Sequence, residues 1–201
     1  MKFADLDLSQ VYSYADYYKW KFEERVELIK GRIFKMSPAP NRLHQELVGK
    51  LHIKLGVFLY DNPCKVYIAP FDVRLPKKSH SDMEIFTVLQ PDLCVICDPK
   101  KLDTRGCIGA PDIVVEVLSP SNNRKELKNK YEAYEDAGVK EYWIVMPYEK
   151  TMFIYTMVDG KYQPSKLLAS GDMVTSASLP GFSIDLSELF GDYEIESEDN
   201  N

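Results

Sequence analysis

The sequence predicts a single α/β (α+β) domain in which helices flank a central mixed β-sheet. Two almost wholly apolar runs, PDLCVIC at 91–97 and DIVVEVLS at 112–119, are typical of strands buried on both faces. Residues 42–60 carry apolar side chains at helical spacing, and a second helical pattern follows at 122–138. Helices that precede and follow buried strands favour a sheet with helices packed on its faces.

The elements before the first apolar run can be placed in chain order. Residues 12–22 are predicted to form a short, aromatic-rich helix, and ERVELIKGRIFKMSP forms a hairpin that turns at 30–31. SPAPN then breaks the chain before the helix at 42–60. KVYIAPFDVRL, at 65–75, is predicted to be a strand pair or one bent strand, with Pro70 at a bulge or an edge.

The elements after the first apolar run alternate between loop, strand and helix. Residues 98–111 are predicted to form a loop that leads into the second apolar strand. The helix at 122–138 begins at an Asn cap, Asn122 or Asn123, and ends at Gly138. A strand at 140–147, a hairpin that turns at Asp159-Gly160 and a short meander complete the domain.

Charge is distributed unevenly along the sequence. The 201 residues are enough to form one domain with a sizeable core. The net charge of −6 argues against a nucleic-acid partner, but residues 182–201 hold seven acids and no Lys or Arg. Without them, 25 basic residues face 24 acidic ones. We expect one domain over 1–185 and a disordered acidic tail over 186–201. Residues 100–130 carry seven basic and four acidic residues, which predicts either a basic surface or a solvated loop and helix face.

The cysteines and the N-terminus indicate a cytoplasmic protein. Cys64, Cys94, Cys97 and Cys107 have irregular spacing, so we interpret them as reduced core thiols. Cys94 and Cys97 lie three apart in a predicted strand and would point to opposite faces, which argues against a zinc site. The N-terminus lacks the apolar stretch of a secretory signal, and no run approaches the ~20 apolar residues of a membrane span.

Two carboxylates interrupt the apolar runs. Asp92 opens one and Glu116 stands inside the other, where an unpaired charge would be costly to bury. If the two strands are neighbours, these carboxylates converge and can hold a divalent ion that supports phosphodiester cleavage. Asp112 is the competing acid, but it would lie ~13 Å from Glu116 on the same strand, too far to share one ion.

The helix that follows carries Glu126, Lys130 and Tyr134 at intervals of four, so they share one face. Either this face is exposed and holds a weak ion pair, or it turns toward the two carboxylates. In the second case Lys130 would orient the attacking water or neutralise charge on the scissile phosphate.

Five stretches, which run in order from about residue 22 to residue 156, carry a resemblance to known proteins: VELIKGRIFKMSPAPNRLHQ, IAPFDVRL, QPDLCVIC, GAPDIVVEVLSPS and KNKYEAYEDAGVKEYWIV. Together they are similar to the PD-(D/E)xK nuclease superfamily, and specifically to the bacterial Uma-type family of restriction endonucleases. The resemblance implies a restriction-endonuclease-like core with a helix on each side of a mixed sheet. It also implies that Asp92 fills the PD position and Glu116 the D/E position.

The chain departs from the superfamily pattern where a lysine is expected. Leu118 stands two residues after Glu116, and the family resemblance instead implies a displaced lysine, Lys130, followed by Tyr134. Glu126 replaces the usual Asp and is not treated as catalytic. The resemblance further implies that Asp92, Glu116 and the backbone carbonyl of Val117 hold the metal. Hard oxygen ligands favour Mg²⁺ or Mn²⁺.

Two further positions, Glu27 and His44, match the family, and each leaves alternatives open. Glu27 either adds a carboxylate to the metal site, or faces solvent in the hairpin or pairs with Lys30 or Arg32. His44 either approaches the phosphate or the ion, or is a capping or surface residue. Asp72 either faces the site or pairs with Arg74 on one strand face.

These observations lead to a prediction with two alternatives. We predict a metal-dependent DNA endonuclease that acts as a homodimer, as a palindromic cut requires. The tyrosines and Trp20 of the first helix either supply the dimer surface or cover the sheet. An inactive, nuclease-like binding module is favoured by the missing lysine at 118, and a structural role by the pI of about 5.2. The predicted phosphate contacts are Lys100, Lys101, Arg105, Arg124 and Lys128.

Overall fold

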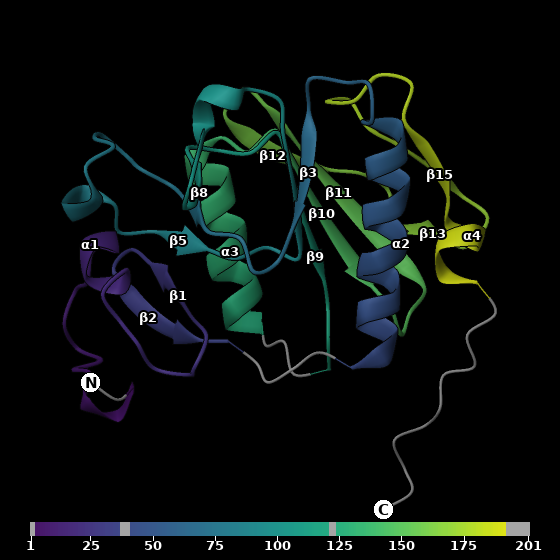
Figure 1. Cartoon of the computed structure of the whole chain (residues 1–201). Helices are drawn as coiled ribbons and strands as arrows, with labels where there is room; N and C mark the ends of the chain where they lie inside the picture. Colours follow the sequence, from purple (N-terminus) through teal and green to yellow (C-terminus); the bar gives the residue numbers. More distant parts are fainter. Residues whose placement is uncertain (1–2, 37–40, 121–123, 192–201) are drawn as a thin grey trace, which may run out of the picture.

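A mixed β-sheet forms the centre of the molecule in the computed structural model, which describes residues 3–36, 41–120 and 124–191 (Figure 1). Its strand order is β12-β11-β10-β9-β6-β3, and β13 pairs with β11. Only β9 and β10 are parallel neighbours among these strands. The bounds are β3 Lys65–Ile68, β6 Leu93–Ile96, β9 Ile113–Val117, β10 Glu141–Met146, β11 Thr151–Val158, β12 Lys161–Pro164 and β13 Leu168–Ala169.

The two long helices cover opposite faces of this sheet. Side chains alternate along β6 and β9, so Leu93 and Val115 face α2 (Arg42–Phe58), while Cys94 and Val114 face α3 (Arg124–Ala137). The predicted α+β fold and the pairing of the two apolar runs are therefore confirmed. None of the helices in the described ranges is long and apolar enough to cross a membrane.

The ends of these helices follow their local sequences. The side chain of Asn41 accepts a hydrogen bond from the backbone N–H of His44 (3.0 Å), which caps α2. Gly138, at φ +81°, ends α3 in the left-handed region that favours glycine. The predicted caps of α3, Asn122 and Asn123, and most of the SPAPN segment lie outside the described residues.

A second sheet packs beside the first and carries the N-terminal hairpin. The predicted turn at 30–31 is confirmed, because Lys30 (φ 52°) and Gly31 (φ 76°) both have positive φ. The prediction of a plain loop over 98–111 is wrong, since that segment forms the β7–β8 hairpin after a 3₁₀ turn. The strand order is β2 (Arg32–Lys35), β1 (Val26–Ile29), β5 (Val88–Leu89), β4 (Val73–Arg74), β8 (Gly106–Ile108) and β7 (Leu102–Asp103).

The first helix, α1, is shorter than predicted and spans Tyr14–Tyr17. The rings of Tyr12 and Tyr14 are buried against Leu28 and Val88 of the second sheet. For Tyr12 and Tyr14, the reading in which the rings cover a sheet is therefore confirmed, whereas Tyr18 is 57% exposed.

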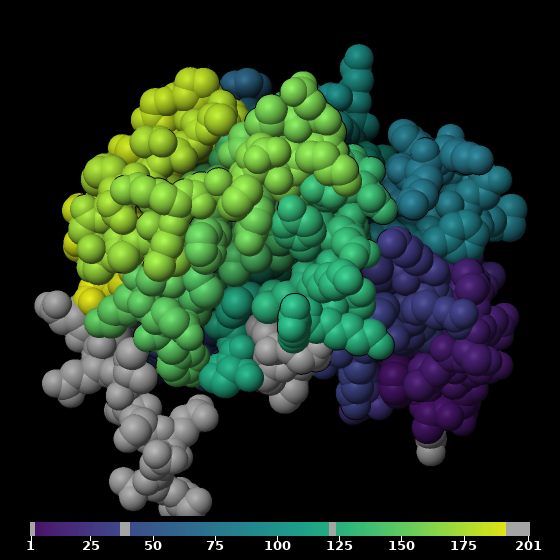
Figure 2. All heavy atoms as spheres, turned by 180° about the vertical axis from the view of Figure 1, so that it is seen from behind, coloured from purple at the N-terminus to yellow at the C-terminus, as the bar shows by residue number. Residues whose placement is uncertain are grey.

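The C-terminal segment folds back onto the central sheet. The strands β14 (Met173–Thr175) and β15 (Ser183–Asp185) pair with each other, and α4 (Leu186–Phe190) buries Leu189 in the core shared with α2. The fold thus continues past the expected boundary at 185. Seen from behind, the N-terminal and C-terminal segments lie on opposite sides of the molecule, with α3 and β10–β12 between them (Figure 2).

The interpretation of all four cysteines as reduced thiols is wrong. Cys64 and Cys97 form a disulfide between the ends of β3 and β6. The antiparallel register explains the pairing, because Lys65 lies opposite Ile96 and the next pair along the ladder is Cys64 with Cys97. Cys94 and Cys107 are free and buried, as predicted for core thiols.

Candidate functional site

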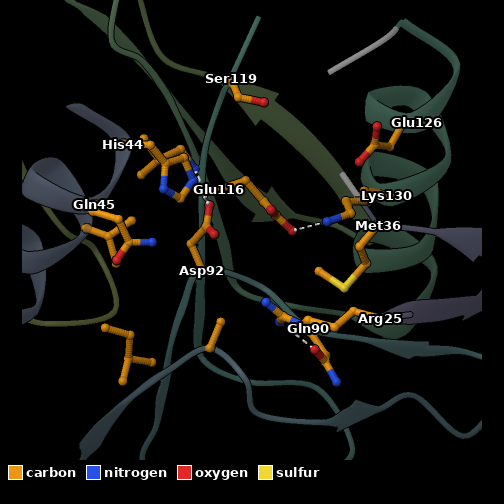
Figure 3. A pocket seen from close by; sticks show the side chains of 14 residues that line it. Arg25, Met36, His44, Gln45, Gln90, Asp92, Glu116, Ser119, Glu126 and Lys130 are labelled. Carbon is orange, nitrogen blue, oxygen red and sulfur yellow. Dashed lines mark hydrogen bonds and ion pairs between the residues drawn. The ribbon is translucent and has the colours of Figure 1, made fainter. Parts of the chain in front are cut away.

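The carboxylates of Asp92 and Glu116 converge at one pocket. β6 and β9 pair with Leu93 opposite Val115, so one step further along the antiparallel register Asp92 comes level with Glu116. Both side chains line a cavity of about 160 Å³ that also reaches Val117, Ser119 and residues of α2 and α3 (Figure 3). The prediction that adjacent strands bring the two acids together is therefore confirmed.

Asp92 is held in place by hydrogen bonds from two other elements. Its Oδ2 accepts a hydrogen bond from the backbone N–H of Val117 (2.8 Å), the residue after Glu116. The ring Nε2 of His44 lies 3.2 Å from the same oxygen. His44 is buried because the capped first turn of α2 packs beside the sheet, and its Nδ1 has no hydrogen-bond partner among the described residues. Of the two readings, the structure therefore supports His44 as a site residue.

Lys130 reaches the site from α3, the layer that covers β9. Its Nζ lies 3.0 Å from Oε1 of Glu116 and 3.3 Å from Oε1 of Glu27, and only 5% of the residue is exposed. The hydroxyl of Tyr134, one turn further on, donates to the same oxygen of Glu116 (2.9 Å). Glu126, one turn earlier, lines the pocket. The exposed reading of this helix face is therefore wrong, and the face points toward the carboxylates.

The electrostatics of this cluster are dominated by burial and by an excess of negative charge. Glu27, Asp92 and Glu116 surround the buried ammonium of Lys130 in the described part of the chain. Burial raises the pKa of Glu116, and the charges of Asp92 and Glu27 add to this effect against the opposing influence of Lys130. Burial alone would lower the pKa of Lys130, but the Glu116 and Glu27 carboxylates outweigh it and raise that pKa.

The donors at the pocket fit a hard divalent cation. Mg²⁺ is usually held by one or two carboxylates together with waters, and Asp92 and Glu116 supply two oxygen ligands at the pocket wall. A dication would also offset the excess of carboxylates over ammonium groups. In the described ranges, no group of three or more His, Cys, Asp or Glu side chains is arranged to hold a metal, so the remaining ligands would be backbone oxygen and water.

Glu27 belongs to the cluster without lining the pocket. It is 3% exposed, so the solvent-facing reading of this hairpin residue is wrong. Its Oε1 accepts a hydrogen bond from the backbone N–H of Gln90 (2.8 Å) and contacts Lys130. This arrangement places Glu27 behind Lys130, as the second carboxylate that holds the ammonium.

Arg25 and Gln90 line the pocket, and sequence reasoning missed both. The Nη2 of Arg25 donates to Oε1 of Gln90 (2.6 Å), while Nε2 of Gln90 donates to Oδ1 of Asp72 (2.8 Å) and lies 3.1 Å from the hydroxyl of Tyr17. Asp72 therefore contacts the pocket residue Gln90 and does not itself line the pocket. The alternative pairing of Asp72 with Arg74 is wrong, because Arg74 forms an ion pair with Asp103. Arg25 precedes Glu27 by two residues, and residues two apart in a strand point to the same face of the sheet. This spacing was the feature of the sequence that could have identified Arg25 as a site residue.

The predicted phosphate contacts lie in different parts of the structure. Arg124 and Lys128 are exposed on the first turns of α3, but each lies two positions from Glu126, and residues two apart on a helix point to different sides. Lys128 instead pairs with Glu132 (3.8 Å). Lys100 and Lys101 follow the end of β6 opposite to Asp92. Arg105 lies in the turn between β7 and β8 and forms an ion pair with Asp82 (2.6 Å). None of these five basic residues lines the pocket.

Comparisons with known proteins bear on the family and on the fold of the chain. A family model described as "Uma2: Putative restriction endonuclease" matches residues 14–187. A solved structure of a putative nuclease belonging to DUF820, from Anabaena variabilis, has a TM-score of 0.70 at 16% sequence identity, and the match covers 89% of this chain and 97% of that chain. No curated protein matches the chain. The similarity to this solved structure shows the fold of the chain and confirms the predicted architecture.

Proposed function

Because this chain belongs to the Uma2 family, whose model carries the description "Putative restriction endonuclease", we propose that it is a metal-dependent endonuclease that hydrolyses phosphodiester bonds of DNA. The observation that carries the proposal is the meeting of Asp92 and Glu116 at one pocket with the ammonium of Lys130 at its wall. Paired carboxylates with a fixed cation are suited to phosphoryl chemistry, because they can hold a metal and stabilise developing negative charge.

In this proposal the side chains have distinct roles. Asp92, Glu116 and the carbonyl of Val117 would hold Mg²⁺ or Mn²⁺, which when bound would polarise a phosphoryl oxygen and lower the pKa of a bound water. The N–H of Val117 and the ring of His44 fix the carboxylate of Asp92. Lys130 places a permanent positive charge next to the position of the phosphate, where it offsets negative charge during the reaction.

DNA would bind through phosphate contacts around the pocket. The exposed side chain of Arg25 lies at the pocket wall, and Arg124 and Lys128 are exposed on the first turns of α3, the helix that also carries the pocket residues Glu126 and Lys130. Lys100, Lys101 and Arg105 lie further away and would reach only DNA that flanks the cut. Affinity that rests on such contacts falls steeply with salt, because each neutralised phosphate releases counterions.

The test is cleavage of plasmid DNA with and without Mg²⁺ or Mn²⁺. We expect Asp92→Asn and Glu116→Gln each to lower the cleavage rate by about 10³-fold or more, and to weaken Mn²⁺ binding in calorimetry. Asp112→Asn is the matched control, because Asp112 is a buried carboxylate at the opposite end of β9. It should keep both activities.

Two outcomes would contradict the proposal. Cleavage that survives both site substitutions would come from another site or from a contaminant. DNA binding without metal-stimulated cleavage in the wild-type protein would favour the alternative of an inactive binding module with a nuclease fold.

A further inference from the structure

Three strands of the second sheet meet the rim of the pocket. β4 and β5 pair with Val73 opposite Leu89, so one step further along the antiparallel register Asp72 comes level with Gln90. Arg25 directly precedes β1, the strand on the other side of β5. The register of the sheet, rather than spacing along the chain, therefore gathers Arg25, Gln90 and Asp72 at one edge.

The side-chain amide of Gln90 has one orientation in this network. Its Nε2 donates to Oδ1 of Asp72 (2.8 Å), and an ionised carboxylate can only accept. The same Nε2 lies 3.1 Å from the hydroxyl of Tyr17, which itself donates to Oδ1 of Asp72 (3.2 Å). A flipped amide would set its oxygen against the carboxylate oxygen. The Oε1 of Gln90 therefore faces Arg25 and accepts from its Nη2 (2.6 Å).

The guanidinium of Arg25 keeps most of its donors for a ligand. Gln90 accepts from one N–H group, and no acceptor in the described ranges takes any of the others. The side chain is exposed and lines the pocket. A planar guanidinium that is held at one nitrogen presents its remaining N–H groups as a fixed fork, which is the geometry that binds phosphate oxygens.

Arg25 stands apart from the carboxylates of the site. The Nζ of Lys130 lies 3.0 Å from Glu116 and 3.3 Å from Glu27, whereas Arg25 forms no ion pair with any carboxylate of residues 3–36, 41–120 and 124–191. Figure 3 shows Met36 between Lys130 and Arg25. A phosphate that reacts at the carboxylates beside Lys130 therefore leaves Arg25 for a different phosphate of the same strand.

We propose that Gln90 is a positioning residue that aims the Arg25 guanidinium at a non-scissile phosphate of bound DNA. The inference rests on the proposed function, since DNA is the ligand of the pocket in both. Asp72 and Tyr17 fix the amide of Gln90, and the amide fixes the guanidinium. Because a guanidinium held in place before binding loses less side-chain freedom when DNA binds, the network raises affinity without adding a charge.

The experiment is a double-mutant cycle on the affinity for a labelled duplex, measured by fluorescence anisotropy with Ca²⁺ in place of Mg²⁺. We expect Arg25→Ala to weaken binding about tenfold, through the loss of a charge-assisted contact. Gln90→Met keeps every charge and should weaken binding about fivefold, because the guanidinium is no longer held. The double variant should bind no more weakly than Arg25→Ala alone, since Gln90 acts only through the guanidinium.

Two further variants accompany the cycle. Arg32→Ala is the matched control, because Arg32 is an exposed arginine at the turn end of the same hairpin, and its affinity for DNA should be unchanged. Asp72→Asn removes the acceptor that orients the amide of Gln90. It should weaken binding in the wild-type background and have no effect in the Arg25→Ala background.

Cleavage kinetics separate Arg25 from the residues at the reacting phosphate. Arg25→Ala should raise KM for a linear duplex about tenfold and lower kcat by less than about threefold, the pattern of a contact made equally in the ground state and the transition state. Glu116→Gln should lower kcat instead. A loss of kcat as large as the rise in KM for Arg25→Ala would place the guanidinium at the scissile phosphate and overturn the assignment.

The binding cycle has two further results that would overturn the proposal. One is normal DNA binding by Arg25→Ala, and the other is a double variant in which the two losses multiply, because Gln90 would then act through another contact. Wild-type protein that binds DNA and gives the expected cycle, but shows no metal-stimulated cleavage, would support this inference and contradict the proposed nuclease activity.

Discussion

The Nζ of Lys130 lies 3.0 Å from Oε1 of Glu116, although the two residues are 14 positions apart and belong to different elements. β9 carries the acid, and α3 returns across the face of the sheet and delivers the lysine from the covering layer. Leu118, the position where the superfamily pattern places a lysine, is therefore not needed for a cation beside this carboxylate. Lys130, which the sequence predicted to replace the missing lysine at 118, thus contacts Glu116 in the structure.

Lys130→Met should destabilise the protein strongly. Above about pH 8, where Glu116 is ionised, the substitution leaves Glu27 and Glu116 buried without their cation, and breaking a buried pair in this way costs about 3–5 kcal/mol. Urea denaturation should show the loss as a lower midpoint. Lys128→Met, two residues earlier with 74% of its side chain exposed, is the control and should change stability by less than about 0.5 kcal/mol. Equal effects of the two substitutions would show that the Lys130 pair is not buried in solution.

The stability of the metal-free protein should depend on pH through Glu116. Burial raises its pKa from 4.5 to about 8. The folded state therefore keeps a proton that the unfolded chain releases, so this contribution to stability is complete below about pH 4.5 and is lost as the pH rises to about 8. Glu116→Gln cannot ionise, and its melting temperature should fall less over this window. Parallel pH profiles of the two proteins would contradict the raised pKa.

DNA binding should separate the basic residues on the first turns of α3 from those beyond the far end of β6. Arg124→Ala and Lys128→Ala should each weaken binding and lower the slope of log affinity against log salt by about one. Fluorescence anisotropy with a labelled duplex, with Ca²⁺ in place of Mg²⁺ to prevent cleavage, gives both quantities. Lys100→Ala is the comparison, because Lys100 lies beyond the opposite end of β6. A larger loss in Lys100→Ala would move the DNA to the other end of the sheet.

Reduction of the Cys64–Cys97 disulfide should lower stability. The bond joins residues 33 positions apart, and closing a loop of this length stabilises a protein by about 3–4 kcal/mol in the chain-entropy description. Thermal unfolding with and without dithiothreitol should reveal the difference. Cys64→Ser should melt at the lower temperature and lose its response to the reductant. An unaltered melting temperature in wild-type protein would mean that the thiols are reduced in solution.

Local patterns were sufficient for most of the secondary structure. The Lys-Gly turn at 30–31, α2, α3 and the apolar strands β6 and β9 follow from side-chain periodicity and from residues that favour turns or caps. The β7–β8 hairpin was missed because its strands are only two and three residues long and depend on pairing with β4. The disulfide was missed because it depends on the register of β3 against β6, which spacing along the chain does not specify.

The sequence by itself identified Asp92 and Glu116 as candidate site residues, because an acid within a buried apolar strand is costly unless it has a partner or binds a metal. It also determined the lysine, through the resemblance to a known family and a helix spacing that aligns Lys130 with Tyr134. Only the tertiary structure decided which face of α3 meets the sheet, that Glu27 and His44 complete the cluster, and that Arg25 and Gln90 border the pocket. These contacts join separate strands and helices, and their geometry depends on packing and register rather than on local sequence preference.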